Sequence, residues 1–134
     1  MNPIQSILLV DDDFDDRFLF EEALSVAGPD IRLQTAIDGV DALEQLKQGH
    51  RPDVIFMDVN MPRMNGIDCL RELQRTPLRD IPVIMYSTSS HYKQECEECG
   101  ANDYIEKPND FEQLCAKLRL VVSKGRPMAP HDKA

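Results

Sequence analysis

Short apolar runs alternate with longer amphipathic stretches along this chain. Apolar runs predict strands at about residues 6–10, 54–57 and 81–86, and alternation of apolar and polar residues predicts a strand at about residues 31–36. A short fifth strand is expected at about residues 102–106. Apolar residues at helical spacing predict the helices that follow, at about residues 15–27, 39–49, 66–74, 92–99 and 111–122. The ordered alternation predicts an α/β fold of the (βα)5 type. We expect a doubly wound, five-stranded parallel sheet with helices on both faces.

Local signals refine the helix ends and faces. Ser89 or Ser90 is expected to cap the fourth helix, which Gly100 ends, and Asn109 or Asp110 the last helix. The spacing of the first helix predicts one buried face, formed by Leu19, Phe20, Ala23, Leu24 and Ala27.

Length and charge restrict the organisation and the partners. The 134 residues are expected to form one domain, residues 1–123, followed by a polar and mobile tail, residues 124–134, too short for an output domain. A formal net charge of −9 argues against direct binding to nucleic acid or an anionic membrane. The N-terminal sequence has neither a signal peptide nor a transmembrane pattern, so we expect a cytoplasmic protein without membrane insertion.

Four cysteines are present, and Cys96 and Cys99 form a C-x-x-C motif. A second such motif and a paired histidine motif are both missing from the sequence, which argues against structural zinc. We interpret the cysteines as incidental reduced thiols, partly buried in the fold.

Polar groups follow four of the apolar runs. Asp11, Asp12 and Asp13 end the first, Asp58 ends the third, and Ser87 and Lys107 end the fourth and fifth. Because parallel strands present their carboxyl ends at one edge of a sheet, these groups are expected to converge, with the Lys107 ammonium at an exposed strand edge. Carboxylates beside a lysine indicate a site for a divalent metal and a phosphoryl group.

Parts of this pattern are also typical of three other kinds of site. The acidic run is compatible with a solvated strand end or helix cap, and its spacing partly matches a calcium loop, but Asp16 stands where that loop needs Gly. Asp58-Val59-Asn60 is also similar to the Asp-x-Asp of haloacid-dehalogenase-type phosphatases. In those enzymes the second Asp is the acid/base, which Asn60 cannot replace.

Together the motifs resemble the receiver domain of bacterial response regulators, the CheY-like family. The resemblance covers roughly residues 5–123 and rests on ILLVDDD (residues 7–13), FMDVNMPRMNG (56–66), IPVIMYS (81–87) and GANDYIEKP (100–108). It implies a flavodoxin-like sheet with strand order 2-1-3-4-5.

The resemblance also implies a phosphorylation site. Asp58 matches the phosphoacceptor of the family. Asp11 and Asp12 match the acidic pair that binds Mg²⁺ together with Asp58 and the backbone carbonyl of Asn60. Oxygen ligands of this kind are the ones that Mg²⁺ prefers.

Three further positions match residues that respond to the phosphoryl group. Ser87 matches the hydroxyl residue that contacts it, Lys107 the lysine that adds positive charge, and Tyr104 the aromatic switch position. We expect movement of the Ser87 loop to let Tyr104 turn inward. The Lys107–Pro108 bond is expected to be cis, as in the family.

The resemblance implies a single-domain response regulator of a two-component phosphorelay. It would accept a phosphoryl group from a histidine kinase or phosphotransfer protein and bind a downstream protein target, as a monomer or a phosphorylation-dependent homodimer. It is not expected to be an enzyme, apart from slow self-dephosphorylation. The alternatives are a constitutive receiver-like binding adaptor that does not cycle phosphate and a magnesium-dependent phosphohydrolase.

Overall fold

The computed structural model describes residues 2–127 and shows a five-stranded parallel sheet. The strand order is β2-β1-β3-β4-β5, which confirms the predicted topology. The strands are β1 (Ser6–Val10), β2 (Arg32–Ala36), β3 (Val54–Met57), β4 (Val83–Ser87) and β5 (Asp103–Glu106).

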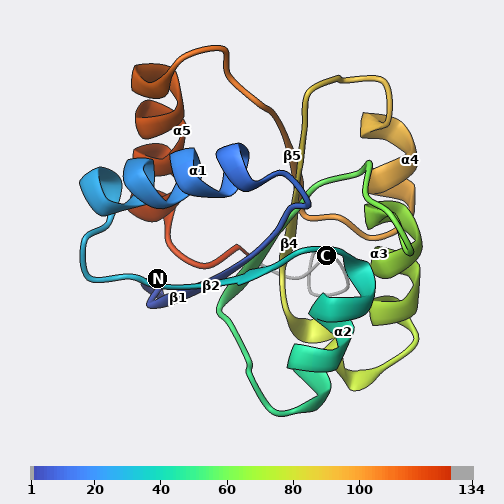
Figure 1. Cartoon of the computed structure of the whole chain (residues 1–134). Helices are drawn as coiled ribbons and strands as arrows, with labels where there is room; N and C mark the ends of the chain where they lie inside the picture. Colours follow the sequence, from blue (N-terminus) through green and yellow to red (C-terminus); the bar gives the residue numbers. More distant parts are fainter. Residues whose placement is uncertain (1, 128–134) are drawn as a thin grey trace.

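Helices cover both faces of the sheet (Figure 1). Helices α1 (Phe14–Ala27) and α5 (Phe111–Lys124) pack side by side on one face. The other face carries α2 (Gly39–Lys47), α3 (Gly66–Gln74) and α4 (Lys93–Glu98), and a short 3₁₀ helix, η1 (Pro77–Asp80), precedes β4. In the described part of the chain, none of the helices is long and apolar enough to cross a membrane.

The hydrophobic core has two layers because successive strand residues point to opposite faces. Ile7 and Leu9 of β1 belong to the layer under α1 and α5, whereas Leu8 and Val10 belong to the layer under α2, α3 and α4. All four residues of β3 are buried, as expected for the central strand of a sheet covered on both sides.

Side-chain caps start most of the helices. Asp13, Asp38, Asn65 and Asp110 each accept a hydrogen bond from the backbone amide three residues ahead. Of the two residues predicted to cap the last helix, Asn109 and Asp110, the structure thus shows Asp110 as the cap.

Helix α4 is shorter than predicted, and its predicted cap was wrong. It begins after Tyr92 without a side-chain cap, because the Ser89 hydroxyl instead accepts from the His91 amide within the preceding turn. Leu19 of α1 is also not buried, since 45% of its surface is exposed.

The segment expected to be a tail begins inside the fold. Helix α5 includes Lys124, and the Arg126 amide donates to the Asn2 carbonyl at 2.7 Å. Residues 128–134, the rest of the expected tail, lie outside the described residues.

Candidate functional site

The strand register brings the predicted polar groups to one edge of the sheet. Val10 of β1 is paired with Met57 of β3, and the Asp58 amide donates to the Val10 carbonyl at 2.9 Å. Asp11 and Asp58 therefore leave neighbouring strands side by side. On the other side of β3, the Lys107 amide donates to the Ser87 carbonyl at 2.6 Å, which fixes the end of β5 against the end of β4.

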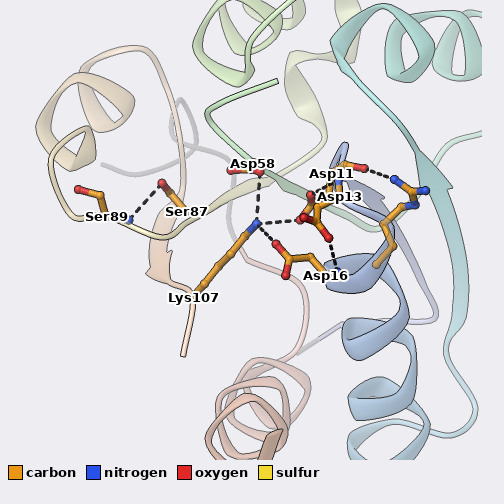
Figure 2. Close-up of polar contacts among 8 residues, drawn as sticks. Asp11, Asp13, Asp16, Asp58, Ser87, Ser89 and Lys107 are labelled. Atoms are coloured by element: carbon orange, nitrogen blue, oxygen red, sulfur yellow. Dashed lines mark hydrogen bonds and ion pairs between the residues drawn. The ribbon is translucent and has the colours of Figure 1, made fainter. Parts of the chain in front are cut away.

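Lys107 links three carboxylates in this site (Figure 2). Its Nζ lies 2.9 Å from Asp11 Oδ2, 2.8 Å from Asp16 Oδ2 and 3.2 Å from Asp58 Oδ2. The expectation of an exposed ammonium was wrong, because only 8% of the Lys107 side-chain surface is exposed. Lys107 is held as a nearly buried cation surrounded by acidic groups.

Asp16 is the site residue that the sequence analysis missed. It lies in the first turn of α1, and its carboxylate makes the shortest of the three contacts with Lys107. The only signal was its position in an acidic run, and 91 residues separate it from Lys107, so the sequence pattern does not reveal the pair.

Asp11 is fully buried and is oriented by its surroundings. Its Oδ1 accepts a hydrogen bond from the Asp13 amide at 2.9 Å, while its Oδ2 accepts one from the Lys107 ammonium. The Arg17 guanidinium donates to the Asp11 backbone carbonyl at 2.8 Å. Asp13 also caps α1, so the same turn that starts the helix positions the Asp11 carboxylate.

Burial changes the acidity of these groups. Burial raises the pKa of Asp58 to about 6; Lys107 opposes this effect, while the charge of Asp11 adds to it. The pKa of Asp11 is also raised, chiefly by burial. Burial alone lowers the pKa of Lys107, but its hydrogen bonds to Asp16 and Asp11 outweigh that effect, so its pKa is raised and it stays charged.

The carboxylates form a donor set suited to a divalent cation. Oxygens of Asp11, Asp12 and Asp58 lie within 4.8 Å of one another, and of these three residues only Asp12 is exposed to solvent. They are hard oxygen ligands of the type that Mg²⁺ takes, and their mutual repulsion raises the benefit of a cation. Asn60 is exposed in the loop after β3, and the role of its carbonyl stays a prediction.

Ser87 and Tyr104 are joined through Ser89. The Ser87 Oγ accepts from the Ser89 amide at 3.4 Å (Figure 2), and the Tyr104 hydroxyl donates to the Ser89 carbonyl. Tyr104 is buried and packs in the core layer under α4. We expected the ring to turn inward when the Ser87 loop moves, but in this structure the ring already lies inside the fold.

The Lys107–Pro108 bond was also predicted wrongly, since no peptide bond between residues 2 and 127 is cis. Trans is the intrinsically favoured form of an X–Pro bond. The Lys107 ammonium reaches all three carboxylates with this bond trans, so the charge cluster does not require the cis form.

The loop after Asp58 is fixed close to the site. The Gly66 amide donates to the Val59 carbonyl, and a Cβ at Gly66 would lie 2.0 Å from the Asp58 carbonyl oxygen. Only glycine permits this approach. Within the loop, before Gly66, Arg63 Nε donates to the buried Asp38 carboxylate at 2.6 Å, which ties the loop to the start of α2.

Comparisons with known proteins agree with this geometry. Residues 7–119 match the sequence model of the response regulator receiver domain. Response regulator MprA of Mycobacterium leprae is 35% identical over 123 residues, which make up 90% of this chain and 52% of MprA. The chain thus spans about half the length of the curated relatives it matches.

Two solved structures show the same fold. The phosphorylated cyanobacterial phytochrome response regulator RcpA is similar with a TM-score of 0.79 and 31% identity, covering 87% of this chain and 89% of RcpA. The receiver domain of sensor histidine kinase PA1611 from Pseudomonas aeruginosa PAO1, with magnesium coordinated in its active-site cleft, gives a TM-score of 0.73 and 28% identity, covering 89% of this chain and 98% of that domain.

The family match includes every carboxylate around Lys107 and the whole sheet except Ser6, the first residue of β1. We conclude that this chain belongs to the family of response regulator receiver domains, the phosphoacceptor modules of two-component signalling.

Proposed function

We propose that this chain is a cytoplasmic response regulator receiver that accepts a phosphoryl group on Asp58. The donor would be a histidine kinase or a phosphotransfer protein, Mg²⁺ would assist, and the signal would be a change in protein binding. The position of Asp58 carries the proposal. It ends the central strand, is 8% exposed, and lies between the acidic pair and Lys107.

In this proposal an Asp58 oxygen attacks phosphorus in line with the leaving group. An oxygen–phosphorus bond forms while the phosphorus–nitrogen bond of a phosphohistidine donor breaks. Phosphoryl transfer depends mainly on positioning and on neutralising charge. The β1–β3 register positions Asp58, and Lys107 supplies a fixed positive charge 3.2 Å from it.

Asp11, Asp12 and Asp58 are the residues that would hold Mg²⁺. When bound there, the ion would neutralise the repulsion between the Asp58 carboxylate and the incoming phosphoryl oxygens. Asp11 is already oriented by the Asp13 amide, so the protein loses little freedom when this ligand is used.

The contacts of Ser89 support a route from the phosphoryl group to the surface. Ser87 would exchange its hydrogen bond with the Ser89 amide for one to the phosphoryl group. Because the Ser89 carbonyl accepts a hydrogen bond from Tyr104 of β5, movement of this loop would change the contacts of the Tyr104 side chain. The surface near α4 and β5 would change, and with it the binding of a downstream protein.

Phosphorylation by acetyl phosphate with Mg²⁺, followed by intact-mass measurement, tests the assignment. Wild type should gain one phosphoryl group and Asp58→Asn none, whereas Asp30→Asn, at an exposed position on the loop after α1, should behave like wild type. Phosphorylation of Asp58→Asn would refute the assignment. Wild type that is not phosphorylated would favour the alternative, a constitutive adaptor that does not cycle phosphate.

Sedimentation with and without a phosphoryl mimic would then separate the two assembly states proposed for the protein. A mass that doubles only with the mimic indicates a phosphorylation-dependent homodimer. An unchanged monomer mass indicates that the signal is transmitted to a different protein.

A further inference from the structure

The C-x-x-C motif ends helix α4 in a tight turn. The Cys99 amide is shared between the Glu95 carbonyl at 3.0 Å and the Cys96 carbonyl at 3.2 Å. The Gly100 amide donates to the Glu97 carbonyl at 3.1 Å, which is again a bond across three residues. In a turn of this 3₁₀ type, side chains three residues apart lie directly above one another. The helix end therefore aligns Cys96 and Cys99.

Both cysteines contact the same core layer. Cys96 is fully buried in the layer under α2, α3 and α4, and Cys99 is half-buried and packs against that layer. Cβ atoms three residues apart in a helix are separated by about 5–6 Å, and a disulfide needs about 3.8 Å. A small tightening of the last turn, which its bonding pattern already favours, would allow the two sulfurs to join.

Arg71 of α3 distinguishes the two cysteines. Its guanidinium pairs with Glu95 of α4 at 3.3 Å, and the charge and hydrogen bond of Cys99 raise the pKa of Arg71. Cys99 is half-buried, with the positive charge of Arg71 beside it. Cys96 is fully buried, and burial raises the pKa of its thiol to about 11. Cys99 is thus the accessible nucleophile and Cys96 the protected thiol behind it.

We propose that Cys96 and Cys99 are a reversible modification site that small-molecule disulfides oxidise to an intramolecular disulfide. The Cys99 thiolate attacks one sulfur of the oxidant and expels its first thiolate, leaving a mixed disulfide on Cys99. Cys96 then loses its proton and attacks the Cys99 sulfur, and the second thiolate leaves. Two cysteines are oxidised, one disulfide is reduced to two thiols, and the protons pass to the leaving thiolates.

The other two cysteines lack this arrangement. Cys69 is buried on α3, and burial raises the pKa of its thiol to about 12. Cys115 is buried in the layer under α1 and α5, on the opposite face of the sheet. Within residues 2–127 the one group of three or more metal-ligating side chains is Asp11, Asp12 and Asp58, so the cysteine pair has no third ligand for zinc.

Oxidised glutathione added to the native, reduced protein tests the proposal by intact mass and peptide mapping. Wild type should lose two hydrogens in mass, join the Cys96 and Cys99 peptides, keep no glutathione, and return to its original mass with dithiothreitol. Cys96→Ala should stop at a stable glutathione adduct on Cys99. Cys99→Ser should stay unmodified, and Cys115→Ser, the matched buried control, should oxidise like wild type.

A wild-type protein that keeps glutathione on Cys99, or in which no cysteine reacts, would overturn the proposal. So would equally fast modification of Cys99→Ser, since it would assign the reaction to another thiol. Thermal melting shows whether each variant is folded. If Cys96→Ala does not fold, Cys99→Ser at its half-buried position decides the question. Phosphorylation of Asp58 is measured separately and does not affect this outcome.

Discussion

Lys107 lies closer to Asp16 than to Asp58. Its ammonium is 2.8 Å from Asp16 Oδ2 and 3.2 Å from Asp58 Oδ2. Because the Asp16 side chain is 36% exposed and that of Lys107 only 8%, Asp16 is the partner that can most easily release the lysine. Asp16 therefore competes with a phosphoryl group on Asp58 for the same positive charge.

Asp16→Asn should accelerate phosphorylation of Asp58 by acetyl phosphate with Mg²⁺. Removing a partly exposed ion pair of up to about 1 kcal/mol corresponds to roughly a two- to fivefold change in rate. Asp15→Asn, at an exposed neighbouring position, is the matched control and should leave the rate unchanged. A slower reaction in Asp16→Asn would show that Asp16 positions Lys107 instead of competing for it.

Lys107→Met should destabilise the metal-free protein near neutral pH by about 3 kcal/mol, because it removes one partner from a nearly buried group of opposite charges. Methionine keeps an apolar chain near the Tyr86 ring, whose centre lies 5.2 Å from the ammonium. Denaturant unfolding should show a smaller loss at about pH 5, where the released carboxylates bind protons. An equal loss at both pH values would mean that packing, and not charge, is the cause.

Asp58→Asn should stabilise the metal-free protein at neutral pH by about 1–2 kcal/mol, once solvent screening is allowed for. The pKa of Asp58 is raised from 3.8 to about 6 in the fold, chiefly by burial. Ionisation of Asp58 therefore does not reduce the free energy of unfolding below about pH 4. The reduction grows as pH rises towards 6 and reaches its full size above that value. Unfolding curves of both proteins in a chelator should differ at pH 7 and coincide near pH 4; a constant difference would contradict the assignment.

Magnesium should stabilise the protein through the three clustered carboxylates, which come together only in the folded state. A site of millimolar affinity at tenfold excess adds about 1.4 kcal/mol, or roughly 3–5 °C in melting temperature. Asp12→Ala should remove most of this shift at fixed ionic strength, and Asp30→Ala should retain it. Equal shifts in the two variants would place the ion elsewhere.

Tyr104→Phe should loosen the Ser89 turn without changing the rate of phosphorylation. The substitution removes the hydrogen bond to the Ser89 carbonyl and keeps the buried ring. Amide hydrogen exchange of the segment from Ser87 to His91 should become faster, and phosphorylation should alter it less than in wild type. Tyr92→Phe, at the position that directly follows this segment, is the control. Unchanged exchange would reduce Tyr104 to a packing residue.

The sequence alone determined the features that depend on neighbouring residues. An apolar run such as Val54 to Met57 specifies a strand, and the Asp that follows it must lie at the carboxyl edge of a parallel sheet. Asn65 caps its helix because its side chain bonds an amide only three residues ahead. Such short-range interactions depend only on residues close together in the sequence. The fold was therefore predicted correctly, and so was the position of Asp11, Asp58, Ser87 and Lys107 at the carboxyl ends of their strands.

Only the tertiary structure decided how those ends interact. Asp16 and Lys107 are 91 residues apart, and nothing local indicates that the first turn of α1 lies against the end of β5. Their packing also covers the Lys107 ammonium, which reverses the expectation of an exposed charge. The buried position of Tyr104 depends in the same way on where α4 packs. Distances, burial and the resulting pKa values are properties of the assembled layers, since each depends on several segments that meet only when the chain is folded.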